Sequence, residues 1–386
     1  MDQIIDVRPE HCGQWGTLLL GEDADPERHQ VTELPPLPPV VTEYRRHGVW
    51  WVAGGAWTQA AWPVTMPAGS LGPRGHATVG YVTGRSGASQ REGQDLLATL
   101  GRTDVSGGGI GALAQARSAA LAAPVAEAQT YVQRQPVRNA EETSWREKRQ
   151  RRGLWISVRP LVTILRRLKT RGAAGAKELL GEVGWGIIGT AHYAGYHRIE
   201  PRQRQLCWAH LKREFMAWSQ RPGETARLGL ALLTAEQQLF GLWYRVRDGT
   251  LAWVDLQVAR LPLMARVSPL LQEGAAGADA KAQGTCRNLL KRAAALWTFV
   301  WEPGVDPTKN AAARPLRRAV LWRRRSFGPQ RAAGGQFVER ILTTVTTLRQ
   351  QRRNVLDYLT AACTAAICKS PAPSLLPLTS PPLLAR

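Results

Sequence analysis

PVRNAEETSWREKRQRRGLWISVRPLVTILR, residues 136–166, is the stretch that decides the fold of this 386-residue chain. Its first eight residues predict a strand that ends in acidic side chains. GLWISV (153–158) and LVTILR (161–166) are two further strand-forming runs, and an Arg-Pro pair separates them. This spacing predicts a β-hairpin, because proline ends one run and the next begins directly after it.

The residues that follow predict an alternation of helix and strand. AAGAKELLGEV (173–183) has a helical composition, and WGIIGTA (185–191) is typical of a buried strand. RQLCWAHLKREFMAWS (204–219) predicts a helix, because its large apolar residues fall close to one helical face. A strand and hairpin followed by helix, strand and helix indicate an α/β domain.

The segments after this core have patterns of their own. Residues 222–300 are almost wholly helical in pattern and indicate an insertion. Residues 336–366 predict a long amphipathic helix or a helix pair. The Pro-rich tail, residues 369–386, is expected to be disordered.

The segments before the core are less regular. Residues 69–130 predict helices, but GRSGAS (84–89) and VSGGGIGAL (105–113) interrupt them, and each interior Gly costs a helix about 0.5–1 kcal/mol. This region is therefore predicted to be loop-rich or weakly folded. A shallow helix-turn-helix with its turn near residues 101–105 is the alternative.

The charge balance favours a polyanionic partner. The chain has 51 Lys and Arg against 30 Asp and Glu, a formal net charge of +21. Such a surplus attracts nucleic acid, and the planar guanidinium of Arg suits phosphate and guanine. The alternative is that the excess of Arg and Ala reflects codon preference alone.

Membrane and secretory classes are not favoured. No run approaches the ~18 apolar residues of a membrane span, and the first ten residues do not resemble a signal peptide. The five cysteines are scattered and odd in number, which does not indicate a disulfide framework. A reduced, cytoplasmic protein is expected.

Two groups of residues could bind a metal. Glu141-Glu142 ends the first predicted strand, where only one carboxylate can face a site that could hold Mg²⁺, since neighbouring strand residues point to opposite faces. The alternative is an acidic turn pair without a ligand role. Cys207, His210 and Glu214 have the spacing of one helical face that could hold zinc, but no further ligand is nearby, and a packed histidine is the favoured interpretation.

A third group could bind nucleic acid. RPLRRAVLWRRRSFG (314–328) interleaves arginines with Trp322 and Phe327, so it could neutralise phosphates and stack on bases. The alternative is a solvated helix face. A second basic run lies at 146–152. The arginines expected to contact DNA are Arg314, Arg317, Arg318, Arg323, Arg324, Arg325, Arg146 and Arg149.

Six long strings occur in the order of one known family. They are EETSWREKRQRRGLWISV (141–158), RQLCWAHLKREF (204–215), GTCRNLLKRAAALWTFV (284–300), PTKNAAARPLRRAVLWRRRSFG (307–328), FVERIL (337–342) and LRQQRRNVLDYLTAAC (348–363). With these strings, and from about residue 5 to about residue 376, the chain resembles the larger transposase protein of the insertion-sequence sixty-six group, a group of bacterial DDE elements. The resemblance implies an RNase H-like core in which three carboxylates bind two divalent cations, Mg²⁺ or Mn²⁺, for phosphoryl transfer at element ends.

The three acid positions implied by the resemblance are largely lost. The family string ADETGW places its first Asp at Glu141, the second Asp falls on Ala191, and the Glu of PTNNAAER falls on Ala313. One acid is therefore lengthened and two are replaced by methyl groups, which cannot bind a metal ion. The copy is expected to be catalytically impaired and to bind neither metal.

The amino-terminal part shows comparable losses. The family has two Cys-x-x-Cys pairs here, and their positions fall on Cys12 and Trp15 and on Trp51 and Gly54, so one sulfur ligand of four remains. Tetrahedral zinc binding is expected to be lost. The family's upstream coiled-coil segment has no counterpart, so the chain is expected to be an amino-terminally truncated copy.

These observations predict an α/β chain whose partner is double-stranded DNA at terminal inverted repeats. Self-association or co-assembly with related transposases is also expected. The predicted segments are a degenerate zinc-module-like segment (1–66), a weakened helical DNA-binding region (67–134), an RNase H-like domain (135–345) with a helical insertion at about 216–300, and a carboxy-terminal helix with a Pro-rich tail (346–386).

Three alternatives to a catalytically impaired DNA-binding protein remain open, one of which is that the gene is a pseudogene whose product folds poorly. In another, the chain is an active transposase that recruits Glu142, Glu182 or Glu339 in place of the lost acids. In the third, it is a non-catalytic regulator that occupies element ends or poisons related transposases. The helical segment 336–366 would then serve as the dimerisation element.

Overall fold

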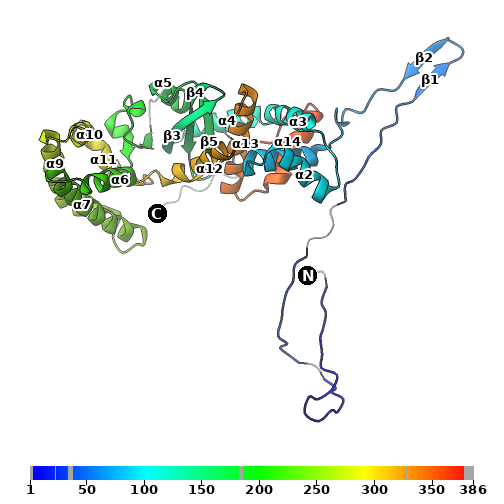
Figure 1. The fold of residues 1–386 in the computed structure, drawn as a ribbon, viewed down its shortest axis with the longest axis horizontal. Coiled ribbons are helices and arrows are strands. Elements are labelled where there is room, and N and C mark those ends of the chain that lie inside the picture. Colours follow the sequence, from blue (N-terminus) through cyan, green and yellow to red (C-terminus); the bar gives the residue numbers. More distant parts are fainter. Residues whose placement is uncertain (1–2, 22, 34–37, 182–185, 327, 378–386) are drawn as a thin grey trace. The chain divides into compact units, whose positions relative to one another are not determined.

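The structure is a computed structural model, and it describes residues 3–21, 23–33, 38–181, 186–326 and 328–377 (Figure 1). The chain divides into two units, Met1–Val40 and Val41–Arg386. In the first unit the chain turns back at Cys12, whose carbonyl accepts a hydrogen bond from Gly16 N at 2.8 Å. The second unit contains every helix and strand of the described chain.

A five-stranded mixed sheet forms the centre of the second unit and confirms the predicted α/β class. Its strand order is β5-β4-β3-β6-β7. The first three strands are antiparallel neighbours, whereas β6 runs parallel to both β3 and β7. The predicted hairpin is β4 with β5. The strands are β3 (Val137–Glu147), β4 (Gln150–Val158), β5 (Thr163–Leu168), β6 (Ile187–Thr190) and β7 (Arg204–Leu206).

Two of the predicted strand and helix ends are wrong. The first strand does not end at its acidic pair, because β3 pairs with β4 from Asn139, opposite Val158, as far as Glu147, opposite Gln150. Only the parallel pairing of β3 with β6 stops earlier, at Asn139. The predicted helix over 204–219 begins with a strand instead, since its first three residues pair with β6. The helix proper is α6 (Trp208–Ser219).

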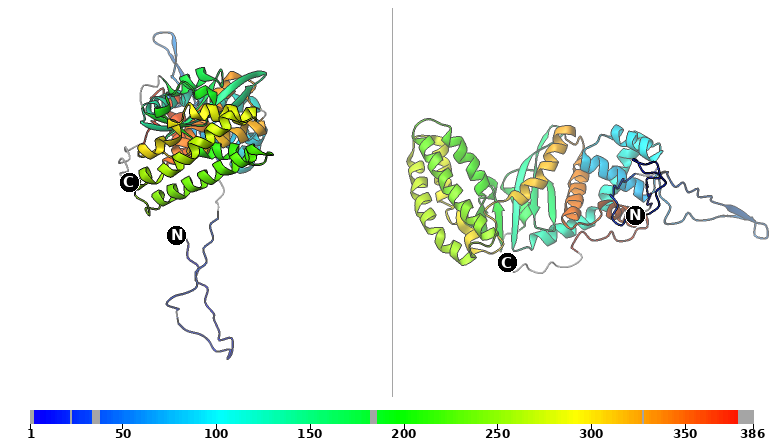
Figure 2. Two further views of the ribbon diagram at one scale, coloured as in Figure 1. Left: turned by 90° about the vertical axis from the view of Figure 1, so that its left-hand side faces the viewer. Right: turned by 90° about the horizontal axis from the view of Figure 1, so that it is seen from below.

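Helices cover both faces of the sheet (Figures 1 and 2). Helix α5 (Ala173–Leu180) packs on one face, where Trp155 and Tyr196 are buried. The other face packs against three helices. The helices on this face are α4 (Ala122–Gln133), α12 (Asn310–Ser326) and α13 (Ala332–Gln350).

Threonine hydroxyls of α13 accept hydrogen bonds from backbone N–H groups of the edge strand β5. Leu165 N donates to Thr343 Oγ1 at 2.9 Å, and Thr163 N donates to Thr347 Oγ1 at 3.1 Å.

The region before the sheet is helical, so the prediction of a loop-rich segment is wrong. The Gly-rich run starts helix α3 because Ser106 Oγ accepts a hydrogen bond from Gly109 N at 3.1 Å and caps the helix. Helices α2 and α3 flank residues 102–106, where the alternative placed the turn of a helix-turn-helix. The elements are α1 (Pro73–Gly80), a π-helical turn η1 (Tyr81–Ser86), α2 (Gln90–Gly101) and α3 (Gly107–Ala120).

Between α6 and α12 the chain forms a helical body with its own core, as the pattern over 222–300 predicted. Leu232, Phe299 and Val300 are among its fully buried residues. Figure 2 shows these helices at one end of the sheet. They are α7 (Glu224–Arg247), α8 (Trp253–Ala259), α9 (Leu261–Ala276), α10 (Ala280–Leu290) and α11 (Ala294–Trp301).

The carboxy-terminal segment is a helix pair, α13 followed by α14 (Val355–Ile367), which confirms one of the two predicted forms. The tail after it is not disordered as far as residue 377. Leu375 is fully buried, and Tyr358 OH donates to Pro373 O at 2.6 Å. The tail is therefore anchored by one buried leucine despite its proline content. Among the described residues, no helix is both long enough and apolar enough to span a bilayer.

Candidate functional site

The two adjacent acids of β3 face opposite sides of the sheet, as strand geometry predicts. Glu142 lies on the α5 side, where Oε2 accepts from Tyr196 OH at 2.7 Å and Oε1 lies 2.9 Å from Arg171 Nη2. Burial, followed by the charge of Glu142, raises the pKa of Tyr196 well above its usual value. Glu142 is fully engaged in this buried cluster, so its environment is structural.

Glu141 faces the α12 side and meets a buried amine. Lys309, immediately before α12, is 1% exposed, and its Nζ lies 2.9 Å from Glu141 Oε1. His210 Nε2 lies 3.7 Å from the same oxygen. Beyond these two contacts, Lys309 Nζ and Glu141 Oε2 have no hydrogen-bond partner in the described part of the chain. The second carboxylate oxygen is therefore buried and unsatisfied.

The strand register brings Ala191 beside Glu141. Parallel pairing aligns Asn139 of β3 with Gly189 of β6. The same register, extended two residues past the end of this pairing, sets Glu141 level with Ala191 and on the same face. On the next strand, Cys207 N donates to Thr190 O at 2.9 Å, so the chain after β7 continues beside the chain after β6.

The start of α12 brings Ala313 to the same place. Ala313 N donates to Lys309 O at 3.3 Å, so Ala313 lies one helical turn beyond the lysine that contacts Glu141. Lys309 N in turn lies 3.4 Å from Cys207 Sγ, directly after β7. These contacts link the surroundings of positions 141, 191 and 313, and we refer to this edge, with Glu141, Ala191, Lys309 and Ala313, as the convergent site.

The side chains present at this edge do not suit divalent metals. Mg²⁺ and Mn²⁺ require several oxygen ligands, whereas Ala191 and Ala313 offer only methyl groups. The one carboxylate that remains, Glu141, already faces the cationic amine of Lys309. Among the described residues, no three His, Cys, Asp or Glu side chains are grouped so that they could hold a metal ion.

A buried arginine fixes the chain around Ala191. Arg204 is fully buried and donates from Nη2 to Ala191 O at 2.6 Å and from Nε to Thr190 Oγ1 at 2.7 Å. Burial, followed by the charge of Arg292, lowers the pKa of Arg204 to about 10, so it stays charged at neutral pH. Nothing in the local sequence pattern of β7 singled out this residue.

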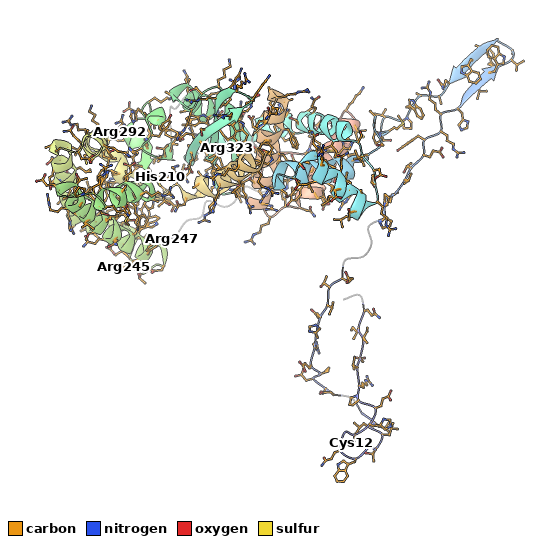
Figure 3. The ribbon with its side chains drawn as sticks, viewed as in Figure 1. Cys12, His210, Arg245, Arg247, Arg292 and Arg323 are labelled. Atoms are coloured by element: carbon orange, nitrogen blue, oxygen red, sulfur yellow. The ribbon has the colours of Figure 1, made fainter. Side chains whose placement is uncertain are left out.

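The residues with zinc-like spacing are not gathered around one point. His210 Nδ1 lies 3.3 Å from Cys207 Sγ, but Glu214 turns instead to His192, with 3.2 Å between Oε1 and Nδ1. Burial, and after it the charge of Lys309, lowers the pKa of His210 to about 4. His210 is therefore neutral at pH 7, and its contact with Glu141 is not an ion pair. Figure 3 labels His210.

The contact between His192 and Glu214 joins two groups whose pKa values burial shifts in favour of their neutral forms. Burial lowers the pKa of His192 to about 4 and raises that of Glu214 to about 7. Because Glu214 binds its proton more tightly in the folded protein, its contribution to stability is present below pH 4.5 and is lost as pH rises to about 7. We therefore expect Glu214→Gln to gain stability relative to the unaltered chain across that interval, measured by urea unfolding at several pH values.

His192 provides the control, because its contribution to stability changes with pH in the opposite direction. His192 has a lowered pKa in the folded state, so its contribution is present above pH 6.5 and is lost as pH falls toward about 4. We expect His192→Gln to gain relative stability as the solution is acidified. A stability difference for Glu214→Gln that stays constant from pH 4.5 to about pH 7 would contradict the assignment.

Helix α12 presents most of the predicted arginines on its solvent side. Ala312, Leu316 and Ala319 are buried in the core between α12 and the sheet. In the described part of the chain, none of the predicted DNA-contacting arginines forms a salt bridge with a carboxylate. Arg314, Arg317, Arg318, Arg324 and Arg325 are exposed and Arg323 is half-buried.

The end of α12 lies against the β3–β4 turn, so the two predicted basic groups meet. Arg323 donates to Ser144 O, and Lys148 N donates to Pro329 O at 3.1 Å. Arg146 and Arg149, at this turn, are exposed. Arg323, labelled in Figure 3, is thus partly engaged by the protein, and so is Arg325, whose Nη1 donates to Ser86 O at 3.3 Å.

One predicted aromatic contact with nucleic acid is wrong. Trp322 is half-buried, stacks on Trp145 with ring centroids 5.9 Å apart, and donates from Nε1 to Thr83 O at 3.2 Å. Its ring therefore joins α12 to β3 and η1 and is not free to stack on a base. Phe327 lies outside the described residues.

The acids proposed as substitutes do not reach Glu141. Glu142 faces the other side of the sheet. Glu339 lies against β5, where its Oε2 accepts from Arg167 N at 2.7 Å and its Oε1 lies 3.1 Å from Arg166 Nε. Strand β4 separates β5 from β3, so Glu339 is two strands away from Glu141. Glu182 lies outside the described residues.

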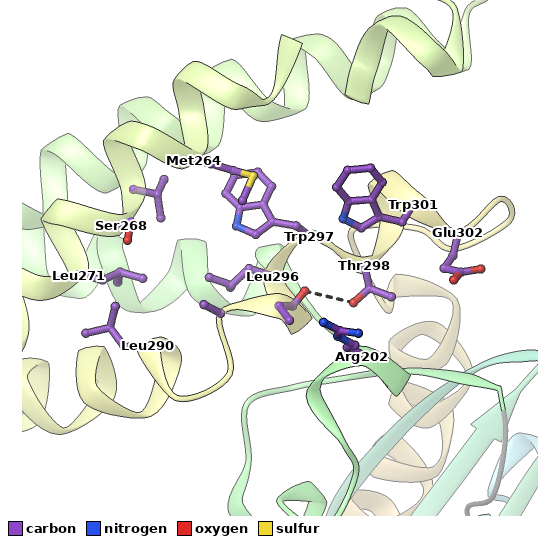
Figure 4. A pocket seen from close by; sticks show the side chains of 13 residues that line it. Arg202, Met264, Ser268, Leu271, Leu290, Leu296, Trp297, Thr298, Trp301 and Glu302 are labelled. Atoms are coloured by element: carbon purple, nitrogen blue, oxygen red, sulfur yellow. Dashed lines mark hydrogen bonds between the residues drawn. The ribbon is translucent and has the colours of Figure 1, made fainter. Parts of the chain in front are cut away.

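A separate cavity of about 500 Å³ lies in the helical body, between α9 and α11 (Figure 4). Its lining is mainly aliphatic and aromatic, with Met264, Leu271 and Trp297 pointing inward and Arg202 at its lower edge. None of the residues around Glu141 lines it. The cavity is therefore not part of the convergent site.

The positions that the resemblance assigned to zinc ligands fall in both units of the chain. Cys12 is partly exposed and has a free thiol in the first unit (Figure 3). Trp51 and Gly54 lie at the turn of a hairpin in the second unit, formed by β1 (Gly48–Trp51) and β2 (Ala56–Gln59). The Trp51 side chain is 63% exposed and makes no buried core.

The central sheet, the helical body and α12 all fall within one recognised family. Residues 93–337, from α2 into α13, match the family described as Transposase IS66 family. The match covers well over half of the chain, and the chain belongs to this transposase family. This confirms the resemblance drawn from the six sequence strings. No curated protein matches the chain.

Proposed function

We propose that this chain is a transposase-family protein that binds double-stranded DNA and does not cut or join it. The order and directions of the five strands support an RNase H-like interpretation of the central domain. Their antiparallel first three members are extended by two parallel strands. The DNA that the chain binds is the end of a transposable element, and the protein is located in the cytoplasm.

The arginine face of α12 is the observation that carries the DNA-binding part. Arg318 of α12 and Arg349 of α13 act on Arg85, since burial and, after it, their positive charges lower the pKa of Arg85. Crowded like charges repel one another unless an anion neutralises them. A phosphate backbone supplies such anions at regular spacing, and released counterions then make binding dependent on salt.

The loss of catalysis is proposed from the convergent site. Phosphoryl transfer by two metals needs oxygen ligands that hold both ions a few ångströms apart. Glu141 is one such ligand, whereas Ala191 and Ala313 provide none. The residues present therefore do not fit a pair of metal ions.

The salt dependence of DNA binding tests the first part of the proposal. We expect Arg317→Gln with Arg318→Gln to reduce the slope of log K against log salt by about two, since each phosphate contact contributes about one. The measurement is fluorescence anisotropy on a duplex of arbitrary sequence at several salt concentrations. A second duplex with candidate element ends would reveal specificity.

A matched variant controls for net charge. Arg245 and Arg247 are exposed on α7, in the helical body and not on α12 (Figure 3). Arg245→Gln with Arg247→Gln removes the same two charges and should leave the slope unchanged. Equal slopes for both double variants would show that α12 is not the DNA-binding face.

The regulator that poisons related transposases is less well supported. Its proposed dimerisation helix is the α13–α14 pair. Ile341, Val345 and Leu348 of α13 and Leu359 of α14 are buried in the core of the same chain. The apolar face that the sequence offered for a partner is thus occupied within the subunit, so we do not propose dimerisation through it.

The remnant zinc module also stays a proposal. It is supported by Cys12 in a tight chain reversal and by Trp51 at the turn of the β1–β2 hairpin. Reversals of this kind suit the paired ligands of a zinc knuckle. With one thiol left, however, the segment would not bind zinc.

A further inference from the structure

We infer that the Lys309 side chain has taken the place of the metal cation at the convergent site. Its ammonium neutralises Glu141 from within the chain, so restored acids alone would not restore metal binding. This inference rests on the proposed assignment of the acid positions. Lys309 thereby acts on the site by excluding a divalent cation.

The first argument is burial. Lys309 is 1% exposed, whereas the Glu141 side chain is 16% exposed. A buried ammonium needs a counter-charge, because removing a charge from water is strongly unfavourable. Glu141 is the carboxylate within ion-pair distance of Lys309 in the described part of the chain, at 2.9 Å. The Lys309 ammonium is therefore held beside the Glu141 carboxylate by their opposite charges.

The second argument is the unsatisfied geometry of the pair. Neither Lys309 Nζ nor Glu141 Oε2 has a hydrogen-bond partner among the described side chains and backbone. Pairs that evolve for stability usually satisfy the remaining donors and acceptors. The charges of Lys309 and Glu141 balance, but the hydrogen-bonding capacity of both groups is not fully used. We expect this arrangement where an amine has replaced a metal ion that had several ligands.

The third argument is the position of Lys309 in the chain. It directly precedes α12 and is one helical turn before Ala313, and its backbone N lies 3.4 Å from Cys207 Sγ, which is level with Ala191. The backbone therefore holds the lysine beside Glu141, one helical turn from Ala313 and next to the residue that follows β7. A divalent cation bound there would lie beside a second positive charge, and the two would repel each other.

The experiment measures metal binding directly and does not depend on activity. The acid-restored variant carries Glu141→Asp, Ala191→Asp and Ala313→Glu. The fully restored variant adds Lys309→Asn, with the residue found in the family string. Titration with Mn²⁺ alone, followed by calorimetry and by electron paramagnetic resonance of free Mn²⁺, gives the dissociation constant of each variant.

We expect the fully restored variant to bind Mn²⁺ about a hundredfold more tightly than the acid-restored variant, since a neighbouring unit charge is removed. The matched control adds Lys291→Asn to the acid-restored variant. Lys291 is exposed and lies outside the site, so this change should leave the affinity as it was. Equal affinity with and without Lys309, or no Mn²⁺ binding by the fully restored variant, would overturn the inference.

A simpler pair of variants covers a failure to fold. Ala191→Asp alone and Ala191→Asp with Lys309→Asn place two acids at the strand ends, and the same comparison of Mn²⁺ affinity applies to them. Thermal unfolding without metal identifies which variants are folded. The DNA-binding slope of the unaltered chain is measured without metal, so a failure of that proposal would be seen independently of the Mn²⁺ result.

Discussion

Replacing Lys309 with Met is expected to lower the free energy of unfolding by about 3–5 kcal/mol, the usual range when one partner of a buried ion pair is removed. Methionine fills a similar volume but has no charge. Glu141 would then keep a carboxylate that is mostly buried, with Oε2 already unsatisfied. Urea unfolding followed by circular dichroism measures the loss.

Two controls separate charge from packing. Arg74→Met breaks an exposed ion pair with Asp357, with 3.4 Å between Nη1 and Oδ1, and should cost less than about 1 kcal/mol. Adding Glu141→Gln to Lys309→Met removes the unpaired carboxylate and should restore much of the lost stability. If Lys309→Met is as stable as the unaltered chain, or if Glu141→Gln adds a further loss, the buried pair is not an essential contact.

The sheet and its hairpin could be predicted because their signals are local. The runs that became β4 and β5 are strongly strand-forming, and the Arg-Pro pair between them marks the turn. β7 could not be recognised in the same way. It has only three residues, and it forms because it pairs with β6. A local sequence pattern does not reveal such a pairing.

The predictions of a loop-rich segment and of a disordered tail were wrong, and the fold shows the physical reasons. The Gly-rich run was expected to break a helix, but Ser106 caps α3 and the helix packs against α13. The Pro-rich tail was expected to be disordered, but Leu375 is buried in the main core. In both cases tertiary packing outweighs local propensity.

The candidate site was predicted in part. The sequence separated the face of Glu141 from that of Glu142, because alternation along a strand is a local rule. Ala191 and Ala313 were assigned through the family resemblance, and their convergence became visible only in the fold. Lys309 was missed, although it stands at an Asn of the family string. A lysine in a polar loop gives no sign of burial until its neighbours are known.

The second large effect concerns catalysis. The unaltered chain is expected to show no nicking of supercoiled plasmid DNA above background with Mn²⁺, because methyl groups stand at two of three ligand positions. Errors of about 1 Å in such a site already cost about a hundredfold in rate. The fully restored variant is therefore expected to nick at least about a hundredfold faster than the unaltered chain, whereas the acid-restored variant should remain near background.

The measurement that tests the account most directly is this plasmid-nicking assay with Mn²⁺. It compares the unaltered chain with the acid-restored and fully restored variants at equal DNA occupancy. Nicking by the fully restored variant alone is the predicted result, and it would place the loss of activity at positions 141, 191, 309 and 313, with Lys309 as a necessary part of it. Nicking by the unaltered chain that persists in Glu141→Gln would contradict the account, because other residues would then carry the reaction.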